Sequence, residues 1–180
     1  MITTPRPRQY SKIQLKMTDG SAIFLSQGIH NQLQNAVVEE FGPRFAPGAS
    51  LLRFESPASK DAVFDGQELA KLNFSVKERD KLPDIILHMP ERNWLFLIET
   101  VNRQGPVTPK RRNEIETLLS GCPSWRVYVT AFLDVKRYQK YAGDIAWETH
   151  VWIAENPDHM IHYNSSELLG PYGTRVRITM

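Results

Sequence analysis

The sequence has almost no cysteine and no long hydrophobic run. One cysteine, Cys122, occurs among 180 residues, which excludes a disulfide framework and any metal site built from several thiolates. The first residues, MITTPRPRQY, are polar and do not resemble a signal peptide. No apolar stretch approaches the roughly 20 residues that a membrane helix needs. We therefore expect a cytoplasmic protein that is not embedded in a membrane.

A large net charge is also missing, since the formal charge is only +2. Basic residues nevertheless gather in two segments that contain no acidic residue, 1–18 and 103–112. Such segments can contact phosphate groups even when the whole chain is close to neutral. The simpler interpretation of the charge pattern, taken alone, is a solvated basic surface. Charge therefore permits a nucleic-acid partner without requiring one.

Turn signals and hydrophobic periodicity predict the elements near the N-terminus. Two alternating runs within 12–26 flank Asp19–Gly20, which indicates a hairpin. An amphipathic helix is expected at 28–41, with Asn31 as its cap. We expect Gly42–Pro43 to end this helix.

The same signals predict an alternation of strands and helices in the rest of the chain. The expected elements are a strand at 49–56, a short helix or loop at 65–74, strands at 83–89 and 93–101, a helix at 109–121 between Thr108 and Gly121, a strand at 125–132, a short helix at 134–143, a strand at 150–157 and a loop-rich tail. This order predicts an α/β fold with an αβββαβ core and a mixed sheet. Strands 83–89 and 93–101 form a central antiparallel hairpin, and the crossover helix makes 93–101 parallel to 125–132.

The length suggests one compact domain. Within it, we expect residues 1–27 to form a basic segment with the hairpin, and residues 28–180 to form the main α/β unit.

Two acidic residues lie within hydrophobic runs, at positions where a buried strand normally has apolar residues. Asp84 follows Pro83 at the start of one central strand, and Glu99 lies near the end of the next. In an antiparallel hairpin these two positions meet at the open end. Buried carboxylates at close range repel each other, and a divalent cation such as Mg²⁺ between their oxygens relieves the repulsion. The alternative is two separate roles, a turn cap for Asp84 and an arginine partner for Glu99.

Two further residues are candidates for this site. Glu40 lies inside the apolar stripe of the first helix, where either the metal site or a salt bridge at the edge of the stripe would give it a partner. Lys110 begins the helix after the strand of Glu99, so it reaches the same end of the sheet and would stabilise charge on a phosphate under attack. Arg111 and Arg112 follow it directly. Three cations in the first turn of a helix suit phosphate binding better than helix stability.

The order Pro83–Asp84, a spacer and Glu99 inside an αβββαβ arrangement resembles the core of PD-(D/E)XK nucleases. Longer blocks resemble the BsuBI/PstI family of type II restriction endonucleases. They read GIHNQLQNAVVEEFGPRFAPGA, KLPDIILHMPERNWLFLIETVNRQGPVTPKRRNEIETLL, VYVTAF, IAWETHVWIAENPDHMIHYN and LGPY. These blocks span about residues 28–172, and the long ones are specific, whereas a Pro-Asp and Glu match alone is short and common.

The resemblance implies Mg²⁺-dependent cleavage of double-stranded DNA within a short palindrome, which is CTGCAG in the type members. It implies that Asp84 and Glu99 are the metal ligands. It also implies a homodimer, because two-fold symmetry matches a palindrome, and a DNA methyltransferase is a possible partner in the same system. The candidates for DNA contact are Arg103, Arg111, Arg112 and Lys60.

The sequence departs from the nuclease pattern at Val101. Nucleases of this type usually carry a lysine two residues after the second carboxylate, and a valine cannot polarise water. We expect Lys110 to take over this role, with Lys60 as the second choice. Glu55 is the candidate to replace the aspartate of a family block that reads FESPASK here.

Three functions remain open on the sequence alone. The first is a restriction-type endonuclease, and the second is a DNA-binding module that keeps the nuclease fold but has lost cleavage. The third is a phage or repair nuclease of looser specificity, because family members usually have a separate helical N-terminal region and this chain is expected to start with the nuclease domain. In the tail, we expect His159 and His162 to lie in a loop and to bond locally or touch DNA. In the Trp-rich block IAWETHVWIAENP, we expect core packing, with a salt bridge for Glu148.

Overall fold

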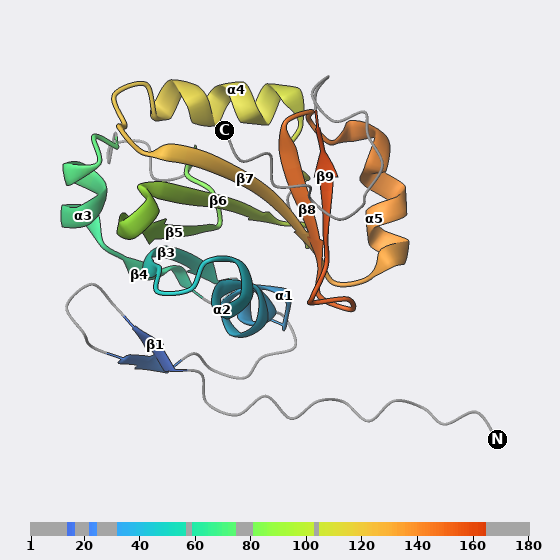
Figure 1. The fold of residues 1–180 in the computed structure, drawn as a ribbon, viewed down its shortest axis with the longest axis horizontal. Coiled ribbons are helices and arrows are strands. Elements are labelled where there is room, and N and C mark those ends of the chain that lie inside the picture. Colours follow the sequence, from blue (N-terminus) through green and yellow to red (C-terminus); the bar gives the residue numbers. More distant parts are fainter. Residues whose placement is uncertain are drawn as a thin grey trace, which may run out of the picture.

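The structure, a computed structural model, has a mixed sheet at its centre (Figure 1). It describes residues 14–16, 22–24, 32–56, 59–74, 81–102 and 105–164. The expected turn at Asp19–Gly20 and the expected cap at Asn31 lie outside these ranges. No helix in the described ranges is long and apolar enough to cross a membrane.

Seven strands form the sheet in the order β4-β3-β5-β6-β7-β8-β9. They are β3 (Ser50–Ser56), β4 (Ser59–Phe64), β5 (Ile85–Met89), β6 (Trp94–Thr100), β7 (Trp125–Phe132), β8 (Thr149–Ile153) and β9 (Met160–Tyr163). The pairs β6–β7 and β7–β8 are parallel, and the other pairs are antiparallel. The αβββαβ core, the central hairpin and the parallel crossover are therefore confirmed. Near the N-terminus, β1 (Gln14–Lys16) pairs with β2 (Ala22–Phe24) as an antiparallel hairpin.

Helices cover both faces of the sheet. They are α1 (Gln32–Ala36), a π-helix (Val37–Phe41), α2 (Gly42–Phe45), α3 (Gly66–Lys71), α4 (Pro109–Leu118) and α5 (Val135–Tyr141), with 3₁₀ turns at Pro90–Arg92 and Ala142–Asp144. Figure 1 shows α4 above the sheet, α1 and α2 below it, and α5 beside β8 and β9. As expected, Thr108 caps α4, because its hydroxyl accepts a hydrogen bond from the backbone N of Arg111 at 3.1 Å.

The central strands are apolar on both faces because each face supports a core of its own. Ile85 and Leu87 of β5 pack in the core between the sheet and α1. Ile86, between them, packs in the core between the sheet and α4. In β6, Leu97 belongs to the α4 side and Ile98 to the α1 side. This alternation follows from the two-residue period of a strand, and it explains the continuous hydrophobic runs around Asp84 and Glu99.

The first helix does not end at Gly42–Pro43, which corrects the sequence-based expectation. It passes through the π-helix and continues as α2 to Phe45. The backbone N–H of Gly42 bonds the carbonyl of Val37, five residues back. Pro43, which has no N–H to donate, then falls in the first turn of the next helical segment, where a proline is tolerated.

Two edge strands were not predicted. Residues 59–64 form β4 beside β3, and residues 160–163 form β9 beside β8, so the tail that was expected to be a loop contains a strand. The expected strand at 150–157 ends earlier, at Ile153. Edge strands have one neighbour and more solvent contact, so their sequences carry a weak hydrophobic pattern.

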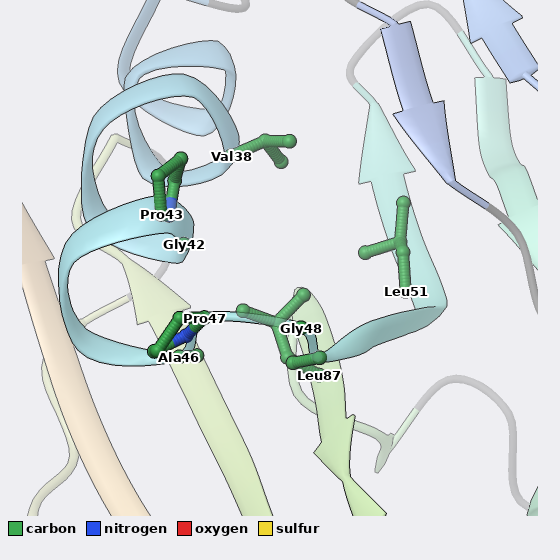
Figure 2. Close-up of a pocket in the computed structure, with 9 residues that line it drawn as sticks. Val38, Gly42, Pro43, Ala46, Pro47, Gly48, Leu51 and Leu87 are labelled. Atoms are coloured by element: carbon green, nitrogen blue, oxygen red, sulfur yellow. The ribbon is translucent and has the colours of Figure 1, made fainter.

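An apolar cavity of about 420 Å³ lies beside α2. Figure 2 shows Pro43 on the helix facing Leu51 of β3 and Leu87 of β5 across this space. Its lining residues are Val38, Gly42, Pro43, Ala46, Pro47, Gly48, Ala49, Leu51 and Leu87. None of these side chains carries a polar atom, so the cavity offers no group for acid–base or metal chemistry.

Candidate active site

The two carboxylates lie together at the open end of the β5–β6 hairpin. Ile85 pairs with Ile98 in the antiparallel register, so Asp84 lies opposite Glu99 one step further along. Both residues are buried, with 5% and 1% of their surface exposed. The hairpin tip, a 3₁₀ turn at Pro90–Arg92, is at the far end. The strand pairing thus brings two acidic groups from distant sequence positions into one buried site.

Thr100 holds one oxygen of Asp84. Its backbone N donates a hydrogen bond to Asp84 Oδ2 at 2.8 Å, and its hydroxyl donates a second to the same atom at 2.6 Å. Burial raises the pKa of Asp84, and the two bonds from Thr100 oppose this effect. Asp84 is therefore fixed in orientation while its negative charge stays costly to maintain.

Arg111 holds one oxygen of Glu99. The guanidinium donates from Nε at 2.8 Å and approaches the same atom, Oε1, with Nη2 at 2.7 Å. Burial, and next the negative charge of Asp84, raise the pKa of Glu99 to about 7, although Arg111 and Arg53 lower it. The second oxygen, Oε2, is buried and has no hydrogen-bond partner. Glu99 therefore has a buried carboxylate oxygen, Oε2, without a hydrogen-bond partner, in a site that disfavours the negative charge of this residue.

A buried arginine contacts the backbone before Asp84 and the carboxylate of Glu55. Arg53 of β3 is 2% exposed, and its Nη1 donates to the backbone oxygens of Leu82, at 3.2 Å, and of Pro83. Its Nη2 forms an ion pair with Glu55 Oε2 at 2.7 Å. Arg53 therefore fixes the backbone that leads into Asp84. Sequence reasoning missed this residue, although a charged side chain within an apolar strand is the same signal that marked the two acids.

Glu55 lies next to Asp84 across the β3–β5 pair. Its backbone N donates to the backbone oxygen of Asp84 at 2.8 Å, and its negative charge helps raise the pKa of Asp84. Its own carboxylate is engaged by Arg53. The structure therefore places Glu55 beside the site, as a partner of Arg53.

The donor atoms of the site suit Mg²⁺. Glu99 Oε2 is a buried oxygen without a partner, and both carboxyl pKa values are raised in a way that a cation would reverse. Among the described residues, no group of three or more His, Cys, Asp or Glu side chains could hold a metal ion. Mg²⁺ commonly uses one or two protein carboxylates and completes its shell with water and substrate phosphates. Asp84 and Glu99 are the residues that fit this pattern.

The other predicted residues have different surroundings. Lys110 is exposed in the first turn of α4, next to the residue that touches Glu99. Arg112 pairs with Glu148 Oε2 at 2.9 Å, which confirms the salt bridge expected for Glu148, and its guanidinium lies 5.7 Å from the ring centre of Tyr128. Val101 is buried among apolar residues near α5. The catalytic and DNA-binding roles of Lys110, Arg111 and Arg112 stay predictions.

The structure does not describe the side chains of two predicted residues, Arg103 and Lys60, and it shows a third, Glu40, in a salt bridge. Arg103 lies outside the described residues, and of Lys60 the structure describes only the backbone, in β4. Glu40 Oε2 pairs with Arg44 Nη1 at 2.6 Å, the salt-bridge alternative for this residue. Its part in the metal site stays a prediction.

His159 lies in the loop before β9, as expected, whereas His162 lies on β9 and not in a loop. His162 of β9 pairs in register with His150 of β8, and their Nδ1 atoms are 2.7 Å apart. A local hydrogen bond was expected for His162, and its setting on a strand corrects the loop. Asp158, also in this tail, pairs with Arg44 at 2.7 Å.

A mixed sheet between helical layers, with Pro83–Asp84 and Glu99 meeting at the open end of its central hairpin, has the architecture of a restriction-endonuclease fold. A domain family described as the BsuBI/PstI restriction endonuclease domain matches residues 13–166. The chain belongs to this family.

Known relatives agree with the family match. The chain is 39% identical to the type II restriction enzyme BsuBI of Bacillus subtilis, across 93% of this chain and 53% of that enzyme. It is 28% identical to the type II restriction enzyme AplI of Arthrospira platensis, across 90% of this chain and 52% of that enzyme. The structure of the SdaI restriction endonuclease superposes with a TM-score of 0.79 at 36% identity, covering 89% of this chain and 51% of that one. The chain spans about half the length of these relatives.

Proposed function

We propose that this chain is the nuclease domain of a type II restriction endonuclease and hydrolyses phosphodiester bonds in double-stranded DNA with Mg²⁺. The observation that carries the proposal is the buried pair of Asp84 and Glu99, of which Glu99 Oε2 has no hydrogen-bond partner. The family match supports the reaction class. Two buried acids without such a role would lower stability for no gain.

In this proposal Asp84 and Glu99 hold the cation. When bound, Mg²⁺ lowers the pKa of a water molecule and neutralises charge on the phosphoryl oxygens. Thr100 keeps Asp84 in one orientation, and Arg111 keeps Glu99 in one orientation. Arg53 anchors the backbone before Asp84 from the core side. These contacts keep the two ligands in place before substrate arrives, which is the general basis of preorganised electrostatic catalysis.

The DNA contacts in this proposal come from four basic residues. Arg111 and Arg112 lie on the first turn of α4, directly after Lys110, the proposed catalytic lysine. Arg103 precedes this helix, and Lys60 belongs to β4. Phosphate contacts from such residues would position the duplex without reading its sequence. Base readout would then set the target, which we expect to be a short palindrome similar to CTGCAG.

The proposal includes an oligomeric state, a partner enzyme and a cellular compartment. A palindrome presents two equivalent strands, so we propose that the active form is a homodimer. A restriction enzyme of this class works beside a DNA methyltransferase that protects the host, and we propose such a partner. The corresponding compartment is the cytoplasm.

A second function is favoured by one observation. Val101 occupies the position where nucleases of this type usually have a lysine, and it is buried in the core. A domain that binds DNA without cutting it would have this feature. Digestion of plasmid DNA with Mg²⁺ separates the possibilities, because discrete fragments support the restriction enzyme, a smear supports a less specific nuclease, and binding without cleavage supports the DNA-binding module.

Asp84→Asn is the control for this experiment. It removes a ligand charge but keeps the shape and the acceptor for Thr100, so we expect cleavage to fall by at least about 100-fold while DNA binding remains. Cleavage by Asp84→Asn at the normal rate would show that the site is elsewhere.

A further inference from the structure

Two histidines face each other across the β8–β9 pair. His150 lies directly opposite His162 in the antiparallel register, and the Nδ1 atoms of the two rings are 2.7 Å apart. The ring planes are almost perpendicular, at 87°, and the ring centres are 4.9 Å apart. The strand pairing therefore brings one nitrogen of each ring to the same place at the edge of the sheet.

The partner of His162 could not be found from its neighbours in the sequence. His159 and His162 have a spacing of three, which brings two side chains together on a helix, whereas residues three apart on a strand face opposite sides. His162 lies on β9, and His159 lies before this strand. The nearby histidine is therefore the one across the ladder, His150.

The surroundings of His150 favour a neutral ring. Val129 of β7 lies on its other side in the sheet. Burial, and next the positive charge of His162, lower the pKa of His150 to about 4. Near pH 7 this ring is a neutral imidazole, and a neutral imidazole is the form that binds metal ions. Between two neutral rings, one Nδ1–H donates to the other Nδ1.

The distance between the two nitrogens suits one metal ion. Zinc–imidazole bonds are about 2.0–2.1 Å long, so two nitrogens on one tetrahedral ion lie roughly 3.3 Å apart. The Nδ1 atoms would need to separate by roughly half an ångström. The ring that has its hydrogen on Nδ1 changes to the tautomer with hydrogen on Nε2, which frees both Nδ1 lone pairs without loss of a proton. His162 is exposed, so the ion can enter from solvent.

We propose that His150 and His162 form a two-histidine site for Zn²⁺, bound through the two Nδ1 atoms with water in the remaining positions. Imidazole suits Zn²⁺, whereas Mg²⁺ takes oxygen ligands. Among the described residues, no group of three or more His, Cys, Asp or Glu side chains could hold a metal ion, so water supplies the other ligands. Strand β7 separates this site from β6 and its carboxylate. The inference therefore goes beyond the proposed nuclease function.

Nuclear magnetic resonance of the imidazole nitrogens tests the site directly. Zn²⁺ is titrated into the full chain labelled with ¹⁵N. We expect both Nδ1 atoms to take the chemical shift of a metal-bound nitrogen and both Nε2 atoms to carry hydrogen, whereas the same concentration of Mg²⁺ should leave both rings unchanged. An ion held by Nε2, by one ring alone or by neither ring would overturn the inference. The measurement involves no DNA, so its outcome is independent of whether the chain cleaves DNA.

The stability of the folded chain gives a second readout. Zn²⁺ at about 100 times its dissociation constant should raise the folding equilibrium constant about 100-fold, because the unfolded chain does not hold the two rings together. His162→Gln removes one ligand at an exposed position. We expect it to weaken Zn²⁺ binding at least about tenfold, since even the loss of a residue that only supports a metal ligand typically costs about 10- to 100-fold. Most of the stabilisation should be lost with it.

His159 provides a matched control. It is also exposed and lies three residues before His162, but it is outside the cross-strand pair. His159→Gln is expected to keep the wild-type response to Zn²⁺ in both measurements. If His159→Gln weakens Zn²⁺ binding as much as His162→Gln does, or if His162→Gln keeps the wild-type affinity, the pair of His150 and His162 is not the site and the inference is wrong.

Discussion

At the scale of single residues, the main electrostatic cost falls on Glu99. Its pKa of about 7, against an ordinary value of 4.5, results from burial and from the charge of Asp84. Between these two pH values the folded chain keeps a proton that the unfolded chain has lost. In the absence of metal, the contribution of Glu99 to stability therefore falls as pH rises from about 4.5 to about 7, and then levels off.

Glu99→Gln removes this dependence, because glutamine has no proton to lose. At about 1.4 kcal/mol per pKa unit, the variant should gain up to about 3 kcal/mol of unfolding free energy at pH 8 relative to the wild type. Urea unfolding in EDTA at several pH values measures this gain. Glu91→Gln, at the exposed hairpin tip, is the control and should keep the wild-type curve. If the unfolding free energies of Glu99→Gln and of the wild type change with pH in the same way, Glu99 does not cause the pH dependence.

Arg53 should be the most sensitive residue of the site for folding. Arg53→Met keeps the length of the side chain but leaves Glu55 and the backbone oxygens of Leu82 and Pro83 without their donor. Breaking a buried pair from one side typically costs about 3–5 kcal/mol. Denaturant unfolding of the variant should show a loss of this size. Because Glu55 is 24% exposed, Glu55→Gln should cost clearly less, and equal losses would contradict the assignment of Arg53 as the anchor.

At the scale of elements, the end of β6 explains the missing lysine. Glu99 is the next-to-last residue of the strand and faces Arg111 of α4, whereas Val101 follows the strand end and packs with Phe132 and Val151 near α5. A lysine at 101 would be placed in an apolar cluster and not at the carboxylates. The positive charge that contacts Glu99 is Arg111, from the neighbouring helix.

Val101→Lys tests this explanation. Burying an ammonium group among apolar side chains should lower the unfolding free energy by several kcal/mol, and it should not increase cleavage. Val101→Met, which keeps the site apolar, is the control and should cost less than about 1.5 kcal/mol. A faster enzyme with Val101→Lys would show that the strand end can reach the site and that the buried valine is not the reason for the missing lysine.

The elements that the sequence predicts well are those with strong internal patterns. Strands β5 and β6 are apolar on both faces, and Thr108 with Pro109 marks the start of α4, so their pairing and the meeting of Asp84 with Glu99 could be anticipated. Strands β4 and β9 lie at the edges and have no comparable pattern. The choice between Lys110 and Arg111 depends on which side of α4 faces β6. One residue along a helix rotates the side chain by about 100°, which the sequence pattern did not settle.

At the scale of the whole molecule, buried Glu99 and half-buried His150 give opposite pH effects. Burial, and next the positive charge of His162, lower the pKa of His150 from 6.5 to about 4. The unfolded chain then takes up a proton first as pH falls from 6.5 toward 4, so stability is lost in that direction. Glu99 has the opposite effect, because its contribution to stability falls as pH rises above about 4.5.

The two effects overlap between about pH 4.5 and 6.5 and should partly cancel in the wild-type chain. Glu99→Gln should therefore reveal a loss of stability on acidification, and His150→Phe should reveal a loss as pH rises. Thermal unfolding across this range, without metal, measures both. If the double variant keeps the pH dependence of either single variant, other groups control the response of the molecule to pH.

The last prediction concerns the number of chains in the active form. Asp84 and Glu99 form the proposed catalytic pair in the described part of each chain, and under the proposed function one pair cuts one strand. Cutting both strands of a palindrome in one binding event therefore needs two chains. Supercoiled plasmid should go directly to the linear form at high protein concentration and accumulate as nicked circles at low concentration, and sedimentation with a specific duplex should show two chains per DNA. With Asp84→Asn chains in large excess, nearly every wild-type chain pairs with an inactive one, so such a mixture should nick without linearising. Linear product from such mixtures at the wild-type rate would mean that one chain cuts both strands in turn.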